Sequence, residues 1–262
     1  MPDDFRILFV ADVVGSPGRD AVKAILPDLK KELQPHLTVL NGENSAGGFG
    51  ITAKLVAELK AAGADVITTG NHVFAQKDFL PELPKLERVL RPANYPPKAP
   101  GQGWCVVEAG GQQVLVINLM GRIFIDALDD PFRAADAILA AEPDRRIVFC
   151  DFHAEATSEK IAMGWYLDGR ASAVVGTHTH VPTADNRVLP GGTAYCTDVG
   201  MVGPRDGIIG MDRENVLKRF LTGVPQKWRI AGGAVTFNSV LINIDRLSGR
   251  AVSIQRIDQV HE

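Results

Sequence analysis

The sequence predicts one α/β domain, a sandwich rich in β-sheet with helices outside it. Short apolar runs alternate with amphipathic segments along most of the chain, as in sheets joined by helical crossovers. The 262 residues can bury a sizeable core, in one large α/β domain or two small ones. The sequence contains no repeat, low-complexity segment or convincing linker, so we predict a single domain over residues 1–262.

Two strand–helix units occupy the first 70 residues. Residues 5–11 form a continuous apolar run, typical of a strand buried on both faces. Ser16 is predicted to cap a helix that begins at Pro17, and the buried stripe of this helix is Val22, Ile25, Leu26, Leu29 and Leu33. A strand over 37–40, a helix over 52–62 and a strand over 65–69 follow. Such units imply a parallel sheet with helical crossovers.

The middle of the chain is less regular, and the alternation resumes after it. Residues 91–97 are too rich in proline for a helix or central strand and predict an ordered loop. Gly110 and Gly111 join two apolar runs, which predicts a β-hairpin over 103–109 and 113–119. The remaining predicted elements are helices over 131–141, 158–167 and 212–221, and strands over 147–152, 171–175, 193–197, 234–244 and 251–257.

Composition and charge exclude several functions. Hydrophobic residues make up 45% and charged residues 23%, which is typical of a soluble globular protein. A net charge of −3 argues against broad binding to nucleic acid or anionic membranes, so we expect neither a stable nucleic-acid partner nor a membrane. The cysteines Cys105, Cys150 and Cys196 have no paired spacing and predict buried, reduced thiols. The start Met1-Pro2-Asp3-Asp4 is unlike a signal peptide, so a cytoplasmic location is expected.

The most informative stretch is the histidine pair that follows the predicted strand over 171–175. The chain has six histidines, and two of them, His178 and His180, lie here in the segment Gly176-Thr177-His178-Thr179-His180. In an extended strand they would point to the same side, as a pair of metal ligands would. A polar loop with two solvated histidines is the alternative reading.

Ligand-type residues also follow four other predicted strands. Parallel strands deliver such residues to the same edge of a sheet, where ligands bind. The residues at these strand ends are Asp12, then Asn41, Glu43 and Asn44, then Asn71 and His72, and then Asp151 and His153. Together with the histidine pair they predict a metal site rather than a merely polar rim.

These motifs resemble those of the calcineurin-like metallophosphoesterases. More narrowly, the stretches Asp12–Arg19, Asn41–Asn44, Asp151–Lys160 and Gly164–Met211 are similar to the bacterial YmdB family, and the resemblance covers almost the whole chain. It implies a four-layer α/β/β/α sandwich with a two-metal centre. It also implies phosphodiesterase activity on cyclic nucleotides, notably 2′,3′-cyclic ones.

The resemblance also assigns the metal ligands, and it divides the histidine pair between two ions. One metal would be held by Asp12, Glu43, Asn44 and His180, and the other by Glu43, Asn71, His153 and His178, with Glu43 bridging. The wider superfamily usually begins Asp-x-His, whereas Val14 stands here and Asn44 replaces the missing imidazole. An oxygen ligand in place of nitrogen weakens the selection of zinc, so iron is expected first and manganese as the alternative.

The ligand set predicts the chemistry. Two divalent ions, two carboxylates and one hydroxide leave about one positive charge, which attracts a phosphodiester despite the negative protein. A metal-bridging hydroxide is expected to attack phosphorus, and His72 to protonate the leaving oxygen. A third ligand or a packed surface histidine is the alternative for His72.

Other candidates are weaker. Asp151 is predicted either to fix the tautomer of His153 or to cap a helix, and Asp185 and Asp198 to stabilise turns rather than to orient His180. Arg122 and Arg170 are expected in surface ion pairs rather than as phosphate clamps. The segment Gly15–Arg19 could hold a phosphate, and Thr157 and Ser158 are predicted to cap a helix. We expect His36 and His261 to be solvated.

Three functions compete. The leading one is a dinuclear phosphodiesterase for small phosphodiesters such as cyclic nucleotides. A nicotinamide-dependent oxidoreductase would need Gly-x-Gly-x-x-Gly after the first strand, and the sequence lacks it. The third is a non-catalytic metal-bound regulatory module. The sequence leaves open whether the chain forms a homo-oligomer.

Overall fold

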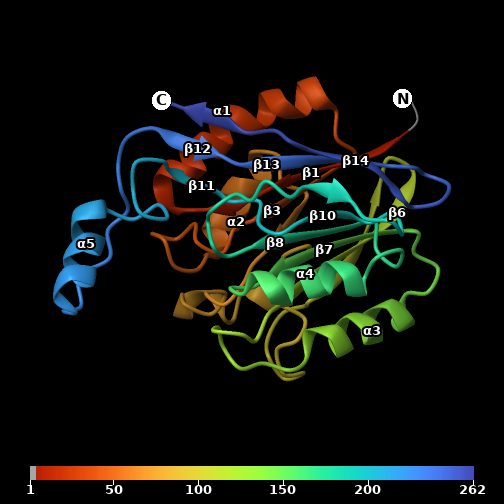
Figure 1. Cartoon of the computed structure of the whole chain (residues 1–262), viewed down its shortest axis with the longest axis horizontal. Coiled ribbons are helices and arrows are strands. Elements are labelled where there is room, and N and C mark those ends of the chain that lie inside the picture. The colour runs from red at the N-terminus through yellow and green to blue at the C-terminus, as the bar shows by residue number, and fades with distance from the viewer. Residues whose placement is uncertain (1–3) are drawn as a thin grey trace.

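Two β-sheets face each other, and helices cover the outer face of each (Figure 1). The computed structural model describes residues 4–262, so the acidic start at Met1 to Asp3 lies outside the described residues. The four layers are α, β, β and α, which confirms the predicted fold class.

The first sheet carries the N-terminal strands in its centre. Its order is β14 (Ala251–Arg256), β13 (Ser239–Ile244), β1 (Phe5–Val10), β3 (Leu37–Asn41) and β4 (Val66–Thr68). Strands β1, β3 and β4 are parallel, as predicted, whereas β13 and β14 run antiparallel. Helices α1 (Gly15–Leu33) and α2 (Ala53–Ala61) pack on its outer face.

The second sheet carries the middle of the chain. Its order is β5 (Trp104–Ala109), β6 (Gln112–Met120), β7 (Ile147–His153), β8 (Ala173–Thr177), β10 (Ala194–Cys196) and β9 (Arg187–Val188). The predicted hairpin is β5–β6, and β6, β7, β8 and β10 are parallel. Helices α3 (Pro131–Ala141) and α4 (Thr157–Tyr166) cover its outer face. Short 3₁₀ helices span Lys77–Phe79 and Leu83–Lys85.

Alternation along each strand builds the core. In β1 the side chains of Phe5, Ile7 and Phe9 enter the core between the sheets. Leu8 and Val10 point to the opposite face and pack with α1 and α2. Burial of each such side chain stabilises the fold by about 1.5–3 kcal/mol. The sheets are therefore fixed relative to each other at the edge where the predicted site residues lie.

A third, smaller sheet was not predicted. It contains β15 (Gln259–His261), β12 (Val235–Phe237), β11 (Met201–Pro204) and β2 (Asp12–Val13). The predicted strand over 234–244 is in fact two strands, because the chain passes from this sheet to the first one at Asn238. Helix α5 (Arg213–Thr222) follows β11 and projects from the body (Figure 1).

Some local predictions were wrong. Helix α1 begins at Gly15 with Val14 as its N-cap, and Ser16 does not cap it, because the Gly15 amide donates to the carbonyl of Asn44. Helix α4 begins at Thr157 after Ala156, and neither Thr157 nor Ser158 caps it. His36 is half-buried rather than solvated, since it stacks on Phe5.

Two further predictions concern burial. His261 lies half-buried in β15 and is not a solvated tail residue. Cys150 and Cys196 are buried free thiols as expected, and Cys105 is partly buried. Within residues 4–262, none of the helices combines the length and the apolar character needed to cross a bilayer.

Candidate metal centre

Four of the predicted ligands form one tight cluster. The Nε2 atom of His153 lies 3.1 Å from Glu43 Oε1, 3.0 Å from Asn71 Oδ1 and 3.0 Å from His178 Nδ1. Ligand atoms of Glu43, His153 and His178 all lie within 4.8 Å of one another. The loop after β4 must approach closely here, because a Cβ on Gly70 would lie 2.2 Å from the His153 ring. Side chains from the ends of four strands thus converge on one point.

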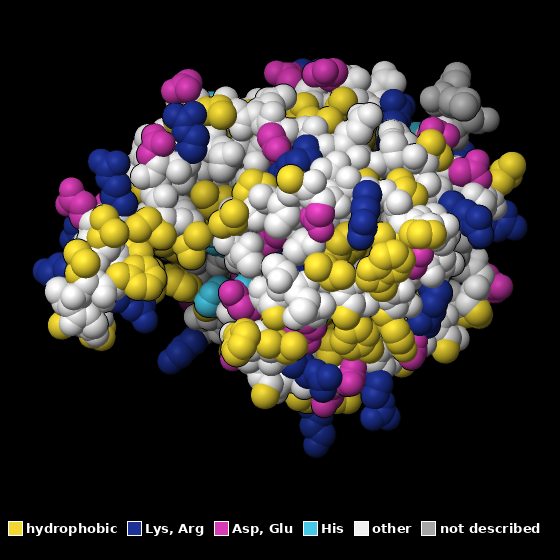
Figure 2. All heavy atoms as spheres, viewed as in Figure 1, with side chains coloured by type: hydrophobic (Ala, Val, Ile, Leu, Met, Phe, Trp, Pro, Cys, Tyr) yellow, Lys and Arg dark blue, Asp and Glu magenta, His cyan; other side chains and the backbone are white. Residues whose placement is uncertain are grey.

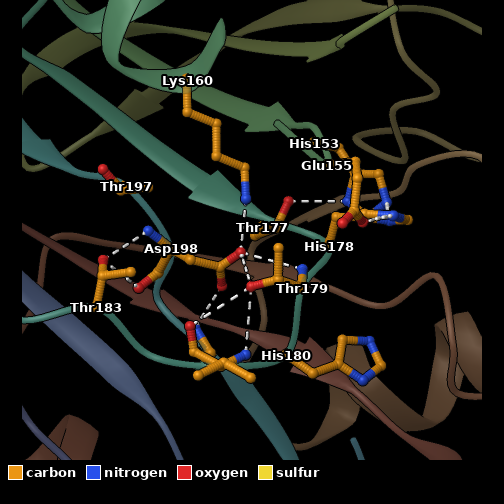
Figure 3. Close-up of polar contacts among 12 residues, drawn as sticks. His153, Glu155, Lys160, Thr177, His178, Thr179, His180, Thr183, Thr197 and Asp198 are labelled. Carbon is orange, nitrogen blue, oxygen red and sulfur yellow. Dashed lines mark hydrogen bonds and ion pairs between the residues drawn. The ribbon is translucent and has the colours of Figure 1, made fainter. Parts of the chain in front are cut away.

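The other predicted ligands, Asp12, Asn44 and His180, form a second group that contacts the same Glu43 oxygen. The Asn44 Nδ2 group is 3.2 Å from Glu43 Oε1 and 3.2 Å from His180 Nε2. His180 Nε2 is 3.6 Å from Asp12 Oδ2. In Figure 3, His178 lies with His153 and Glu155, whereas His180 lies apart from them. The two histidines therefore belong to different halves of the cluster, and Glu43 is shared between the halves.

The histidine pair does not lie in extended strand, as the alternation argument assumed. Strand β8 ends at Thr177, and both His178 and His180 have left-handed backbone, with φ of 105° and 64°. Two residues outside the extended region need not point to the same side. The extended backbone on which the expectation rested is therefore absent at these histidines, although both line the same cavity.

Asp198 holds this turn in place. Its Oδ2 atom accepts from the Thr179 amide at 3.1 Å and from the Thr179 hydroxyl at 2.8 Å (Figure 3). The Nζ atom of Lys160 lies 2.6 Å from the same oxygen. Asp185 accepts from Thr183 and Thr197. Both aspartates therefore stabilise turns, as predicted.

Asp151 orients His153 through an intervening hydroxyl. Thr177 Oγ1 donates to Asp151 Oδ1 at 2.8 Å and lies 2.9 Å from His153 Nδ1. Since the threonine proton points to the carboxylate, the hydroxyl oxygen accepts from Nδ1–H, and in the neutral ring that a metal ligand must present, Nε2 would carry the lone pair toward the cluster. Burial raises the pKa of Asp151, against the hydrogen bonds from Thr68, Asn41 and Thr177. Asp151 does not cap α4, whose N-cap is Ala156.

The cluster concentrates negative charge in a buried place. Burial raises the pKa of Asp12 well above its usual value, and the neighbouring Glu43 raises it further. Burial also opposes ionisation of Glu43, but the charge and hydrogen bond of His153 outweigh it and lower the Glu43 pKa. Burial lowers the pKa of His178 to about 3, and the charge of His153 acts in the same direction. Two adjacent buried carboxylates are stable together only beside positive charge.

Two buried oxygens in the site lack hydrogen-bond partners. Among the described residues, only three buried side-chain polar atoms are unpartnered, and two of these are Asp12 Oδ1 and Asn44 Oδ1. Orphaned buried acceptors are rare in native proteins and call for a cation or donor. The carboxylate, amide and imidazole donors present here suit divalent metal ions. The residues therefore fit a metal centre.

His72 lies at a cavity beside the cluster. Its amide donates to Glu43 Oε2 at 3.2 Å, and its ring packs edge-on against Phe49. The cavity has a volume of about 370 Å³ and is lined by Glu43, Asn44, Gly48, Phe49, His72, Glu155, His178, Thr179, His180, Ile209, Met211 and Trp228. His72 thus faces the space in front of the predicted ligands.

Sequence reasoning missed several residues of the site. Glu155 Oε2 lies 3.0 Å from His178 Nε2, but a charged residue just after a strand end is ordinary surface sequence. The cavity residues Ile209 and Met211 lie at the end of the Gly164–Met211 stretch but are apolar and were not singled out, and Trp228 follows α5 in a segment that carries no motif. Thr177 was passed over because a threonine between glycine and histidine has no signal of its own.

The remaining candidates lie outside the site. Arg122 pairs with Asp130, and Arg170 pairs with Asp136, so both are in surface ion pairs as expected. The Gly15–Arg19 segment faces protein rather than a ligand, because the Gly15 amide bonds Asn44 and Arg19 bonds the Ser45 carbonyl. This helix start supports the Asn44 turn.

The four-layer sandwich, with carboxylate, amide and imidazole groups gathered at one edge of its sheets, has the fold of solved 5′-nucleotidases. At the level of the fold, a 5′-nucleotidase precursor from Thermus thermophilus superimposes with a TM-score of 0.57 at 15% identity, over 98% of this chain and 54% of that one. The chain belongs to the YmdB-like protein family, whose model matches residues 8–257.

Two relatives match nearly the whole chain. The 2′,3′-cyclic-nucleotide 2′-phosphodiesterase of Bacillus subtilis (strain 168) is 56% identical over 96% of both chains. The crystal structure of a hypothetical protein from Thermus thermophilus is 46% identical, with a TM-score of 0.93 over 98% of this chain and 100% of that one. The resemblance stated from the motifs is thus confirmed.

Proposed function

We propose that this protein hydrolyses 2′,3′-cyclic nucleotides at the cluster around Glu43, using two divalent metal ions. The chain is a phosphoric diester hydrolase by family, and the named Bacillus subtilis relative supports this substrate. The observation that carries the proposal is the division of the ligand-type residues into two halves that share Glu43, with an orphaned oxygen on Asp12 and another on Asn44. Residues 1–262 act as one catalytic domain.

The proposed ligand sets follow the two halves. Asp12, Glu43, Asn44 and His180 would hold one ion, and Glu43, Asn71, His153 and His178 the other. When bound, the ions would acidify a water molecule and stabilise charge on the phosphoryl oxygens. Iron is the expected metal and manganese the alternative. Thr177 and Asp151 fix the His153 ring in the tautomer that a ligand needs.

His72 is the proposed proton donor. In the hydrolysis a water oxygen forms a bond to phosphorus, the bond from phosphorus to the 2′ oxygen breaks, and that oxygen takes up a proton to give a 3′-monophosphate. His72 lines the cavity, and its backbone amide is bonded to Glu43, so its ring is held beside the reacting centre. General acid catalysis of this kind is worth about 10²–10⁴ in rate.

Hydrolysis by protein of known metal content tests the proposal. Metal-loaded protein should convert adenosine 2′,3′-cyclic monophosphate to the 3′-monophosphate, and Glu43→Gln should lose both metal and activity because it removes the shared carboxylate. A metal-loaded protein that hydrolyses no phosphodiester would overturn the proposal. If Glu43→Gln then still abolished the biological effect, the non-catalytic regulatory module would be the correct reading.

A further inference from the structure

The cavity has two walls of different chemistry. The polar lining includes His72, Glu155 and four of the predicted ligands, Glu43, Asn44, His178 and His180, and the apolar lining is formed by Phe49, Ile209, Met211 and Trp228. The chain between β11 and β12, which carries α5, forms an arm that projects from the body. Figure 2 shows a histidine in the hollow between this arm and the body, with hydrophobic side chains on the arm side of it. The metal chemistry described above needs only the polar wall. The apolar wall is therefore unexplained by the reaction itself.

Trp228 is held firmly on this wall although it is exposed. The segments on both sides of it are tied down, since Asn215 Nδ2 donates to the Lys227 carbonyl at 3.2 Å and the Asp212 amide donates to the Arg229 carbonyl at 2.8 Å. The Arg219 guanidinium lies over the indole, 5.1 Å from its centroid. The side chain is nevertheless 43% exposed. A large ring that is held by its neighbours and lines a cavity while partly exposed is suited to stacking with a ligand.

Phe49 connects Trp228 to the proton donor. Its ring centroid lies 6.1 Å from that of Trp228 and 5.0 Å from that of His72. The Phe49 carbonyl accepts from Gln76 Nε2 at 2.7 Å, which fixes its loop. Gly48 allows close packing on this side, since a Cβ there would lie 2.7 Å from Met211 Cε. A row of aromatic rings thus runs from His72 through Phe49 to Trp228.

We propose that this apolar wall is a nucleobase subsite, in which Trp228 is the stacking platform and Phe49 borders it. The inference rests on the proposed function, because it places the phosphodiester at the ligands and the base across the cavity. The wall is made of apolar side chains, and the Ile209 carbonyl already lies 3.0 Å from His180 Nδ1. The subsite therefore accepts all four bases by stacking and favours purines for their larger rings.

A substrate without a base separates this subsite from the chemistry. Adenosine 2′,3′-cyclic monophosphate is compared with 1-O-methylribose 2′,3′-cyclic phosphate by kcat/KM. Trp228→Ala should lower kcat/KM roughly ten- to hundredfold for the adenosine ester and leave the base-free ester unchanged. Trp228→Phe should retain most of the activity on the adenosine ester.

Trp165 offers a matched control. It is 50% exposed on α4, and Arg187 lies over its ring at 5.7 Å, but it does not line the cavity. Trp165→Ala should leave kcat/KM unchanged for both esters. Equal loss on both substrates in Trp228→Ala, or no loss on either, would overturn the subsite while the proposed function stands.

A binding measurement decides the case in which the unaltered protein hydrolyses neither ester. The proposed function then fails, and calorimetric titration compares adenosine 3′-monophosphate with ribose 3-phosphate. Tighter binding of the nucleotide that is lost in Trp228→Ala supports the subsite. Equal binding of the two compounds overturns it.

Discussion

Lys160 Nζ lies 2.6 Å from Asp198 Oδ2, and each side chain is only 1% exposed. This buried pair connects α4 to the turn that carries both histidines, because Asp198 also bonds Thr179. The position of His178 and His180 thus depends on a charge pair that contacts no predicted ligand.

Removal of one partner of this pair should destabilise the fold. Lys160→Met leaves the Asp198 carboxylate buried without its cation, which costs about 3–5 kcal/mol in similar cases. Urea unfolding should show that loss. The double variant Lys160→Met, Asp198→Asn should be more stable than Lys160→Met alone, because no charge is stranded. A double variant no more stable than the single one would contradict this account.

Replacement of His72 should separate metal binding from turnover. His72→Ala removes the proposed proton donor but none of the proposed ligands, so metal content should be unchanged and kcat should fall by about 10²–10⁴. Elemental analysis and steady-state kinetics on the same preparation measure both quantities. Full activity would remove His72 from the mechanism, and loss of metal would make it a ligand.

The hydroxyl of Thr177 should control metal affinity. Thr177→Val removes the oxygen between Asp151 and His153 Nδ1, and the loss of such a partner typically weakens metal binding about 10- to 100-fold. Thr68→Val is the control, since Thr68 also donates to Asp151 but does not contact His153. Titration with Mn²⁺ should show weaker binding in Thr177→Val only. If both variants bound Mn²⁺ equally, the orienting role would be wrong.

Metal should stabilise the fold through the two orphaned oxygens. Mn²⁺ at about 100 times its Kd should add about 2.7 kcal/mol to the free energy of unfolding and raise Tm. Asp12→Asn should reduce that rise, whereas Asp185→Asn should keep it because Asp185 only stabilises a turn. Thermal melts with Mn²⁺ and with a chelator measure the difference. An undiminished rise in Asp12→Asn would argue against Asp12 as a ligand.

His36 should make stability depend on pH. Burial lowers its pKa, and the cations Arg246 and Arg6 lower it further. The unfolded chain therefore binds a proton below the ordinary value of 6.5 that the folded chain does not, so stability should fall as pH decreases below that value. His36→Gln should show a smaller decrease in urea midpoint than the unaltered protein. Equal decreases in both proteins would exclude His36 as the cause.

The strand ends were predictable because parallel strands deliver their following residues to one edge. Asp12, Glu43, Asn71, His153 and the histidine pair were placed together on that ground, and the structure brings them together. The side on which His178 and His180 point was not predictable from alternation. Their left-handed backbone is imposed by contacts such as those of Asp198 with Thr179, which lie far apart in sequence.

The apolar wall could not be predicted from the sequence, because its residues are distant along the chain and come together only in the folded structure. Phe49 follows β3, whereas Trp228 follows α5, and neither position carries a motif. The break at Asn238 was missed for a similar reason. The run over 234–244 is uniformly suited to a strand, and only the partners on each side assign β12 and β13 to different sheets.

The segment that carries α5 leaves the body at Pro204 and returns at Val235, and these two residues are paired in β11 and β12. Because its two ends are already adjacent, a change in the length of this segment costs little loop-closure entropy. The proposed ligands lie outside this segment. Most of the proposed nucleobase subsite is therefore encoded in one stretch of the gene, and exchange of this segment with its Ile209 carbonyl kept beside His180 is a route to a new substrate preference on unchanged proposed ligands.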